Sequence, residues 1–199
     1  MKKIIIISFS IFILSCSAAM AYSAPETIAG VSLGKSYHEL RSVLDLDSMD
    51  SQWNEDYLKR IEIMPMQGYR SGYVVVGNCK RKDVVLKIKL NYKDDSVEFF
   101  NSLYTKLRKR YGNPVDWRGN PFGTLKIWKW SLKDSKGNIS LILHHFSGDD
   151  DSTTQGNCIK LSRPEFIKEE RLCWEKDHPE PTDNIIPAKI KGLDWFLPY

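Results

Sequence analysis

Apolar and polar residues alternate along several short segments of the chain, a pattern typical of β-strands with one face in solvent. The clearest segment is 84–92, where Leu86, Ile88 and Leu90 point one way and the lysines between them point the other. The same criterion predicts further strands over 57–64, 72–79, 125–132, 139–146 and 158–162. Residues 46–56 are polar and predict a loop.

Apolar residues recur at helical spacing in three other segments. The predicted helices cover residues 36–45, about 95–111, and Pro164 to about Lys176. Ser36 and Glu39 form a capping box at the start of the first helix. Gly112 suits the left-handed residue that ends the second helix, and Pro114 prevents its continuation.

The order of these elements predicts an α+β fold in which a helix followed by three antiparallel strands occurs twice. The two units span residues 30–92 and 95–162 and form one domain over 22–176, which ends in the third helix. Residues 177–199 are rich in proline yet apolar, and they predict an extended strap across the domain. The alternative is an arm that binds a partner.

Gly30-Val-Ser-Leu-Gly-Lys-Ser36, which runs into Glu39-Leu40, resembles the opening of small bacterial envelope domains of the SmpA/BamE-like kind. The resemblance covers about fifteen residues. It implies a helix packed on a three-stranded antiparallel sheet and a location in the cell envelope. Those proteins are shorter lipoproteins, so the resemblance implies layout and compartment and delivers no activity.

The N-terminus has the three parts of a secretory signal. A basic start at Lys2 and Lys3 precedes an apolar run over 4–14 and the triplet Ala19-Met20-Ala21. The apolar run is too short to span a bilayer. We expect cleavage after Ala21 and a periplasmic or secreted protein with no transmembrane span.

Cys16 provides an alternative to this cleavage. Ile13-Leu-Ser-Cys16 resembles a bacterial lipobox, in which the cysteine would become a lipidated N-terminus. A single acyl chain would give reversible membrane anchoring only.

Cleavage of 21 residues from 199 leaves 178, which is enough for one domain with a substantial core. The formal charge of +4 loses two lysines and becomes +2 in the mature chain. This mild balance, together with the compartment, argues against nucleic acid as a partner.

Three cysteines, Cys79, Cys158 and Cys173, remain after cleavage. An oxidising compartment permits one disulfide and leaves one thiol. The spacing favours Cys158–Cys173, and the alternative is that all three cysteines are reduced and buried.

Candidate metal ligands lie near the end of the strand over 139–146. His145, Asp149 and Asp151 carry suitable atoms. Adjacent strand residues face opposite sides, so His144 and His145 are not expected to share one site. We therefore expect no metal, cofactor or catalytic set, although a metal-dependent hydrolase that uses these histidines and nearby acids is an alternative function.

Aromatic and basic residues supply the candidates for binding. Trp128 and Trp130 share one strand face and predict either core packing or, if exposed, a platform for carbohydrate or peptide. The full set of binding candidates is Trp117, Arg118, Lys126, Trp128, Trp130, Trp195 and Phe196. A basic run over 106–110 adds an anionic partner to the alternatives, although it also complements the helix dipole.

These observations predict a non-enzymatic extracytoplasmic protein, most simply a periplasmic one, that binds an envelope protein, a cell-wall component or an anionic lipid. A secreted interaction or inhibitor protein is the second alternative to the hydrolase, with the apolar C-terminal segment as its contact.

Overall fold

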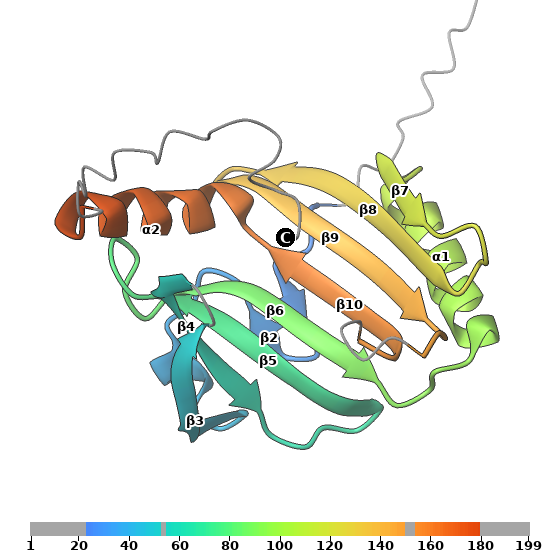
Figure 1. Cartoon of the computed structure of the whole chain (residues 1–199), viewed down its shortest axis with the longest axis horizontal. Coiled ribbons are helices and arrows are strands. Elements are labelled where there is room, and N and C mark those ends of the chain that lie inside the picture. Colours follow the sequence, from blue (N-terminus) through green and yellow to red (C-terminus); the bar gives the residue numbers. More distant parts are fainter. Residues whose placement is uncertain (1–22, 53–54, 150–153, 180–199) are drawn as a thin grey trace, which may run out of the picture.

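The computed structural model describes residues 23–52, 55–149 and 154–179. Within this part of the chain, one antiparallel sheet of eight strands dominates the molecule (Figure 1). Its strands are β3 (Leu44–Gln52), β4 (Glu55–Ile63), β5 (Tyr69–Gly77), β6 (Val85–Tyr92), β7 (Asp116–Gly119), β8 (Leu125–Asp134), β9 (Gly137–Phe146) and β10 (Gly156–Ser162). The remaining elements are β1 (Thr27–Ile28), β2 (Val31–Ser32), the 3₁₀ turn η1 (Tyr37–Leu40), α1 (Val97–Tyr111) and α2 (Pro164–Asp177).

The sheet consists of two meanders that join at its centre. The strand order is β3-β4-β5-β6-β10-β9-β8-β7, so β6 of the first meander pairs with β10 of the second. Ile88 lies opposite Leu161 and Leu90 lies opposite Ile159 in this central pair. Apolar residues from both halves of the chain therefore meet in one core, and the strands at the junction are buried.

The predicted α+β fold of two helix-plus-three-strand units is wrong. The capping box at Ser36 and Glu39 forms, because each side chain accepts a backbone N–H at the start of η1. The element is one 3₁₀ turn, however, and not the helix over 36–45 that the pattern and the envelope-domain resemblance imply. Residues 46–56, predicted as a loop, belong mostly to β3 and β4. A cap satisfies only the first backbone donors of a helix, whereas β3 pairs with β4 at both of its ends, through Leu44 and Asp45 and through residues 50–52.

The second predicted helix is confirmed as α1. The Ser96 hydroxyl accepts the Phe99 backbone N–H at 3.2 Å and caps its start. Gly112 follows its last residue with a positive φ of 79°, which favours glycine over residues with a Cβ. The local signals at both ends suffice here because α1 also has a continuous apolar stripe, which lies on the sheet.

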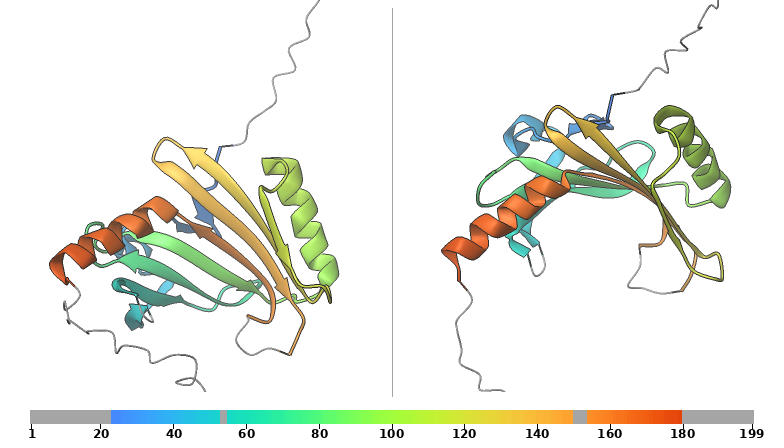
Figure 2. Two further views of the ribbon diagram at one scale, coloured as in Figure 1. Left: turned by 45° about the horizontal axis from the view of Figure 1, so that its top comes forward. Right: turned by 90° about the horizontal axis from the view of Figure 1, so that it is seen from above.

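The two helices lie on opposite faces of the sheet, as Figure 2 shows most clearly in its right-hand view. One face packs against α1 and the N-terminal segment and forms the main core, which includes Phe100 and Trp130. The other face meets α2 at one end only. There Phe166 and Ile167 cover a small cluster of Leu58, Val75 and Leu86.

Covalent and polar contacts fix α2 to the β5–β6 connection. Cys79 is bonded to Cys173, so the predicted Cys158–Cys173 pairing is wrong, and Cys158 is a buried free thiol. The buried Glu170 carboxylate accepts the backbone N–H groups of Asn78, Cys79 and Arg81. A side chain at Gly77 would approach this carboxylate to 2.8 Å, so glycine is required for close approach. Spacing favoured Cys158, but this residue lies near the start of β10, opposite Asn91 and His144, toward the end of the sheet that α2 does not cover.

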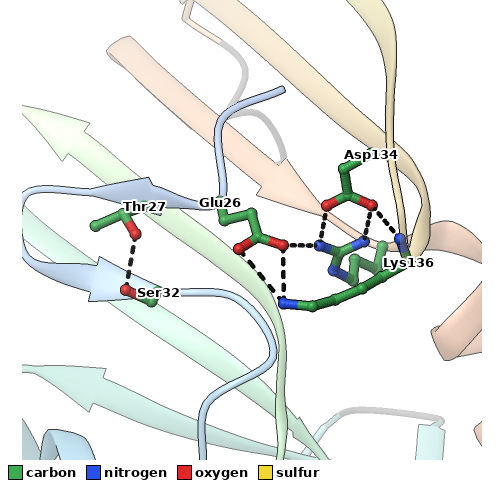
Figure 3. A network of polar contacts seen from close by, with 6 residues as sticks. Glu26, Thr27, Ser32, Asp134 and Lys136 are labelled. Carbon is green, nitrogen blue, oxygen red and sulfur yellow. Dashed lines mark hydrogen bonds and ion pairs between the residues drawn. The ribbon is translucent and has the colours of Figure 1, made fainter. Parts of the chain in front are cut away.

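A second polar cluster joins the start of α2 to the N-terminal segment (Figure 3). The Arg163 guanidinium is buried and donates hydrogen bonds to both carboxylate oxygens of Asp134 and to Glu26. This arginine holds the pKa of Asp134 well below its usual range. Lys136 adds a 3.1 Å ion pair to Glu26. A buried charge with matched partners explains this network as structural.

Among the described residues, no helix is long and apolar enough to cross a membrane.

Candidate functional site

Four neighbouring lysines form a cluster on the sheet face that α2 covers at one end. Lys89 lies directly opposite Lys160 in the β6–β10 pair, and Ile142 of β9 separates Lys160 from Lys129 of β8. Lys87 lies two residues before Lys89 on β6, and therefore on the same face. Its partner Val75 belongs to the cluster beneath α2, which identifies the face. We call Lys87, Lys89, Lys129 and Lys160 the lysine face.

Within the described ranges, none of these lysines forms an ion pair with a carboxylate, although nine ion pairs occur there. Lys89 is only 8% exposed, and its ammonium donates to the Thr154 hydroxyl at 2.5 Å. Burial lowers the pKa of both Lys87 and Lys89, and for Lys87 the Glu55 carboxylate offsets part of this effect. Like charges directly opposite each other in a sheet destabilise it. The lysine face therefore carries a cost to folding.

The Tyr73 ring on β5 lies close to three cationic side chains of the neighbouring strands. The Arg60 guanidinium is 4.0 Å from the centre of the Tyr73 ring, and the Lys87 and Lys89 ammonium groups are 5.8 and 5.7 Å from it. Cations at these distances interact with the negative face of an aromatic ring. Burial raises the pKa of Tyr73, so its hydroxyl stays neutral and does not cancel the positive charge.

A cavity of about 190 Å³ lies on the same face, between β7 and β10. Its lining consists of Asp116, Arg118, Ile127, Lys129, Ile142, His144 and Lys160. Asp116 accepts a hydrogen bond from the Arg118 Nε atom at 3.2 Å. We call this space the β7–β10 cavity; it combines cations at its walls with two isoleucines.

His144 and Cys158 meet on this face. They are opposite each other in the β9–β10 pair, and the His144 Nδ1 atom is 3.4 Å from the Cys158 sulfur. Burial lowers the pKa of His144 to about 4, and the positive charges of Lys160 and Lys89 add to the effect. Burial raises the pKa of the Cys158 thiol. An activated cysteine nucleophile requires the reverse, a thiolate beside an imidazolium, so this pair is a neutral packing contact.

His145 points to the opposite face and lies among core residues. Its Nδ1 atom is 2.8 Å from the Asn157 side-chain oxygen, and its ring lies 5.5 Å from that of Phe100. The Asn157 amide in turn donates to the backbone oxygens of Asp94 and Ser96, which precede α1. His145 therefore holds the connection to α1 in place.

The predicted metal candidates are not brought together. His145 is in the core, Asp149 is exposed beyond the end of β9, and Asp151 lies outside the described residues. In the part of the chain that the structure describes, the group close enough to hold a metal is Cys79, Cys173 and Asp177. The two cysteines of that group are joined in the disulfide.

The predicted binding residues are divided between the two faces. Trp130 is buried and donates its indole N–H to the Gly112 carbonyl at 2.9 Å. Trp128 packs at 4.9 Å against Tyr104 of α1, so core packing, and not an exposed platform, describes this pair. Trp117 is 53% exposed beside Trp128. Lys126 shares the α1 face, Arg118 borders the β7–β10 cavity, and Trp195 and Phe196 lie outside the described residues.

Sequence reasoning missed Lys87, Lys89 and Lys160 as site residues. Alternation along β6 placed Lys87 and Lys89 on the polar face of one strand. This alternation does not indicate which strand pairs with β6. The pairing of β6 with β10, which puts Lys160 opposite Lys89, joins segments about seventy residues apart.

The fold and site define a protein built on one β-sheet, with a buried core face and a basic face. Comparison with family models, curated proteins and solved structures found no match to this chain. The resemblance to SmpA/BamE-like domains therefore stays a prediction about compartment.

Proposed function

We propose that this protein is a non-enzymatic, periplasmic binding protein that holds an anionic component of the cell envelope on its lysine face. The observation that carries the proposal is the set of four lysines without a carboxylate partner in the described residues. Opposed, partly desolvated cations destabilise the free protein, and an anion on this face would relieve that cost.

The clustering of positive charges on the lysine face favours an anionic ligand over a neutral one. Clustered charge of one sign on a partly desolvated surface attracts the opposite charge from a distance and raises the association rate. Arg60, which lies over the Tyr73 ring, is neutralised by its 2.5 Å ion pair with Glu62, so the positive charge of this face comes from the lysines.

Two features support an extracytoplasmic location. The sequence over 1–21 has the basic, apolar and small-residue parts of a cleavable signal. The Cys79–Cys173 disulfide suits an oxidising compartment such as the periplasm.

A vesicle-binding experiment tests the ligand class. Vesicles of phosphatidylglycerol mixed with phosphatidylcholine should bind the protein, and vesicles of phosphatidylcholine alone should not. The double variant Lys87→Gln/Lys160→Gln should weaken binding about a hundredfold, on the basis of about tenfold for each lost charged contact.

The matched control removes the same charge from the other side of the sheet. Lys106 and Lys109 are exposed on α1, so Lys106→Gln/Lys109→Gln should retain binding if the lysine face is responsible. Equal loss in both double variants would mean that net charge alone drives binding and would reject the proposal.

A mass measurement tests the compartment. The protein recovered from an expressing bacterial cell should begin at Tyr22 and be two hydrogens lighter than its reduced form. A lipidated N-terminus at Cys16 would place the protein on a membrane, whereas an uncleaved chain in the cytoplasm would reject a periplasmic function.

A further inference from the structure

We propose that the β7–β10 cavity is a subsite for a phosphate monoester, which makes the anionic ligand a phosphorylated molecule. This inference rests on the proposed function, because the cavity is the part of the basic face with a defined shape.

The charges around the cavity match a dianion. Among the described residues of the lining, Arg118, Lys129 and Lys160 are positive and Asp116 is the one carboxylate, so their net charge is two positive. A phosphate monoester carries close to two negative charges at neutral pH, while a phosphodiester or a carboxylate carries one. A monoanion would leave one cation uncompensated in a space that is partly closed to water.

The hydrogen-bonding groups of the lining also suit phosphate oxygens. Asp116 engages the Nε atom of Arg118 at 3.2 Å and orients the guanidinium, whose remaining N–H groups stay available as donors. Planar guanidinium donors bind phosphate in a bidentate manner, and ammonium groups act as point charges beside them.

His144 supplies a neutral side to the cavity. Its pKa of about 4 keeps the ring uncharged at neutral pH, and the protonated Cys158 thiol is placed to donate to Nδ1 at 3.4 Å. That arrangement leaves the ring proton on Nε2, which is a donor and so favours oxygen acceptors. His144 therefore supplies a donor to the cavity without adding further charge.

The volume and the isoleucines limit what the phosphate is attached to. A space of about 190 Å³ corresponds to roughly six water molecules at about 30 Å³ each. A phosphate group and a short organic segment fill it, with carbon atoms against Ile127 and Ile142. Both a soluble phosphate monoester and the headgroup of a lipid phosphomonoester have this chemistry.

Calorimetric titration with soluble probes tests the subsite. Glycerol 3-phosphate, a monoester, should bind at least about tenfold more tightly than glycerophosphoglycerol, a diester of the same alcohol. Arg118→Gln and Lys129→Gln should each weaken glycerol 3-phosphate about tenfold, in line with the loss of one charged hydrogen bond. Lys87→Gln, outside the cavity, should change it less than about twofold.

Vesicles distinguish the two sources of the phosphate. If the natural ligand is a lipid, phosphatidic acid vesicles should bind in an Arg118-dependent manner even where glycerol 3-phosphate is weak, and phosphatidylglycerol vesicles should lack that dependence. Binding of glycerol 3-phosphate alone supports a soluble ligand. Circular dichroism of each variant checks that it is folded.

The failures of the two proposals are distinguishable. Equal affinity for monoester and diester probes, or no effect of Arg118→Gln on any probe, would overturn the subsite. The lysine face would survive that result if Lys87→Gln/Lys160→Gln still weakened binding to phosphatidylglycerol vesicles. No binding to any anionic probe would overturn both.

Discussion

The two faces of the central sheet are made from the same strands and have opposite chemical character. The face beneath α1 is a continuous apolar core with Trp130 and Phe100 fully buried. The face beneath α2 has a small apolar cluster at one end and the lysine face over the rest. Alternate residues of each strand point to opposite sides of the sheet. The same strands therefore form both an apolar face that stabilises the fold and a lysine face that destabilises it.

Two adjacent histidines show this difference between the two faces of the sheet. His145 lies in the core with a hydrogen bond to Asn157, while His144 lies among lysines with its pKa lowered to about 4. Residue type and position in the chain are almost identical for the two. The environment on each side of the sheet decides that one serves packing and the other borders a cavity. Surfaces retained at a cost to stability are the ones to examine for function.

The largest expected effect is on the core face. Trp130→Ala removes a buried indole and its hydrogen bond to Gly112, and should lower the free energy of unfolding by about 4 kcal/mol. Chemical denaturation measures it. Trp117→Ala, at a residue 53% exposed, is the matched control and should cost less than about 1 kcal/mol. Similar losses for both would contradict the placement of Trp130 in the core.

The second effect concerns the attachment of α2 to the opposite face. Cys79→Ala/Cys173→Ala removes a bond that closes a loop with a sequence separation of 94, and should cost about 3 kcal/mol. Reductant should lower the melting temperature of wild-type protein but leave the double variant unchanged. The Cys158→Ala variant should keep this sensitivity to reductant. If reductant no longer lowered the melting temperature of that variant, Cys158 would belong to the disulfide.

A somewhat smaller effect should appear as a pH dependence. His144 has a folded pKa near 4 and an unfolded pKa near 6.5, so the unfolded chain binds the proton first as pH falls. Stability from this group is therefore complete above about pH 6.5 and declines toward pH 4, by about 2–3 kcal/mol.

His144→Gln should show a flatter stability profile than wild type between pH 7 and pH 4, measured by denaturation at each pH. His145→Gln is the control for a histidine on the other face, and the carboxylates of the chain are common to all three proteins. Parallel profiles for wild type and His144→Gln would show that His144 is not held neutral by its surroundings.

The smallest effect should be a gain in stability. Lys160→Gln removes repulsion with Lys89 across the β6–β10 pair and should raise the free energy of unfolding by about 0.5 kcal/mol. The gain should shrink at high salt, because screening already reduces the repulsion. A loss of stability would mean that Lys160 has a favourable partner and that the lysine face does not cost the fold anything.

Local signals predicted the elements whose ends and faces are determined within a few residues. The helix α1 follows from its cap and apolar stripe, and the pairing faces of β6 follow from alternation over 87–92. Leu86, predicted on the side of Ile88 and Leu90, lies instead on the α2 face, because the register shifts between Val85 and Lys87. The segment over 36–52 was predicted wrongly as a helix and a loop, because a capping box gives no information on helix length. Residues in β3 such as Asp45 and Asp47 are compatible with a strand because one side of that edge strand is exposed.

The candidate site was predicted only in part, and the limit is again physical. Arg118 was among the predicted binding residues and borders the β7–β10 cavity, but its partner Lys160 lies on β10. Cys158 was assigned to a disulfide by spacing. Its place opposite His144, near the start of β10 and distant from the end of the sheet that α2 covers, depends on strand register that spacing does not encode.

The sequence by itself determined the periodicity of α1 and β6, the capping box at Ser36, and the separation of His144 from His145, because each of these depends on contacts within one turn or one strand. Only the tertiary structure decided that β6 pairs with β10, that Cys79 meets Cys173, and that four lysines from three strands form one surface. Such pairings depend on the competition among distant segments for the same core. That competition is settled by the burial of the whole apolar face and not by any one segment.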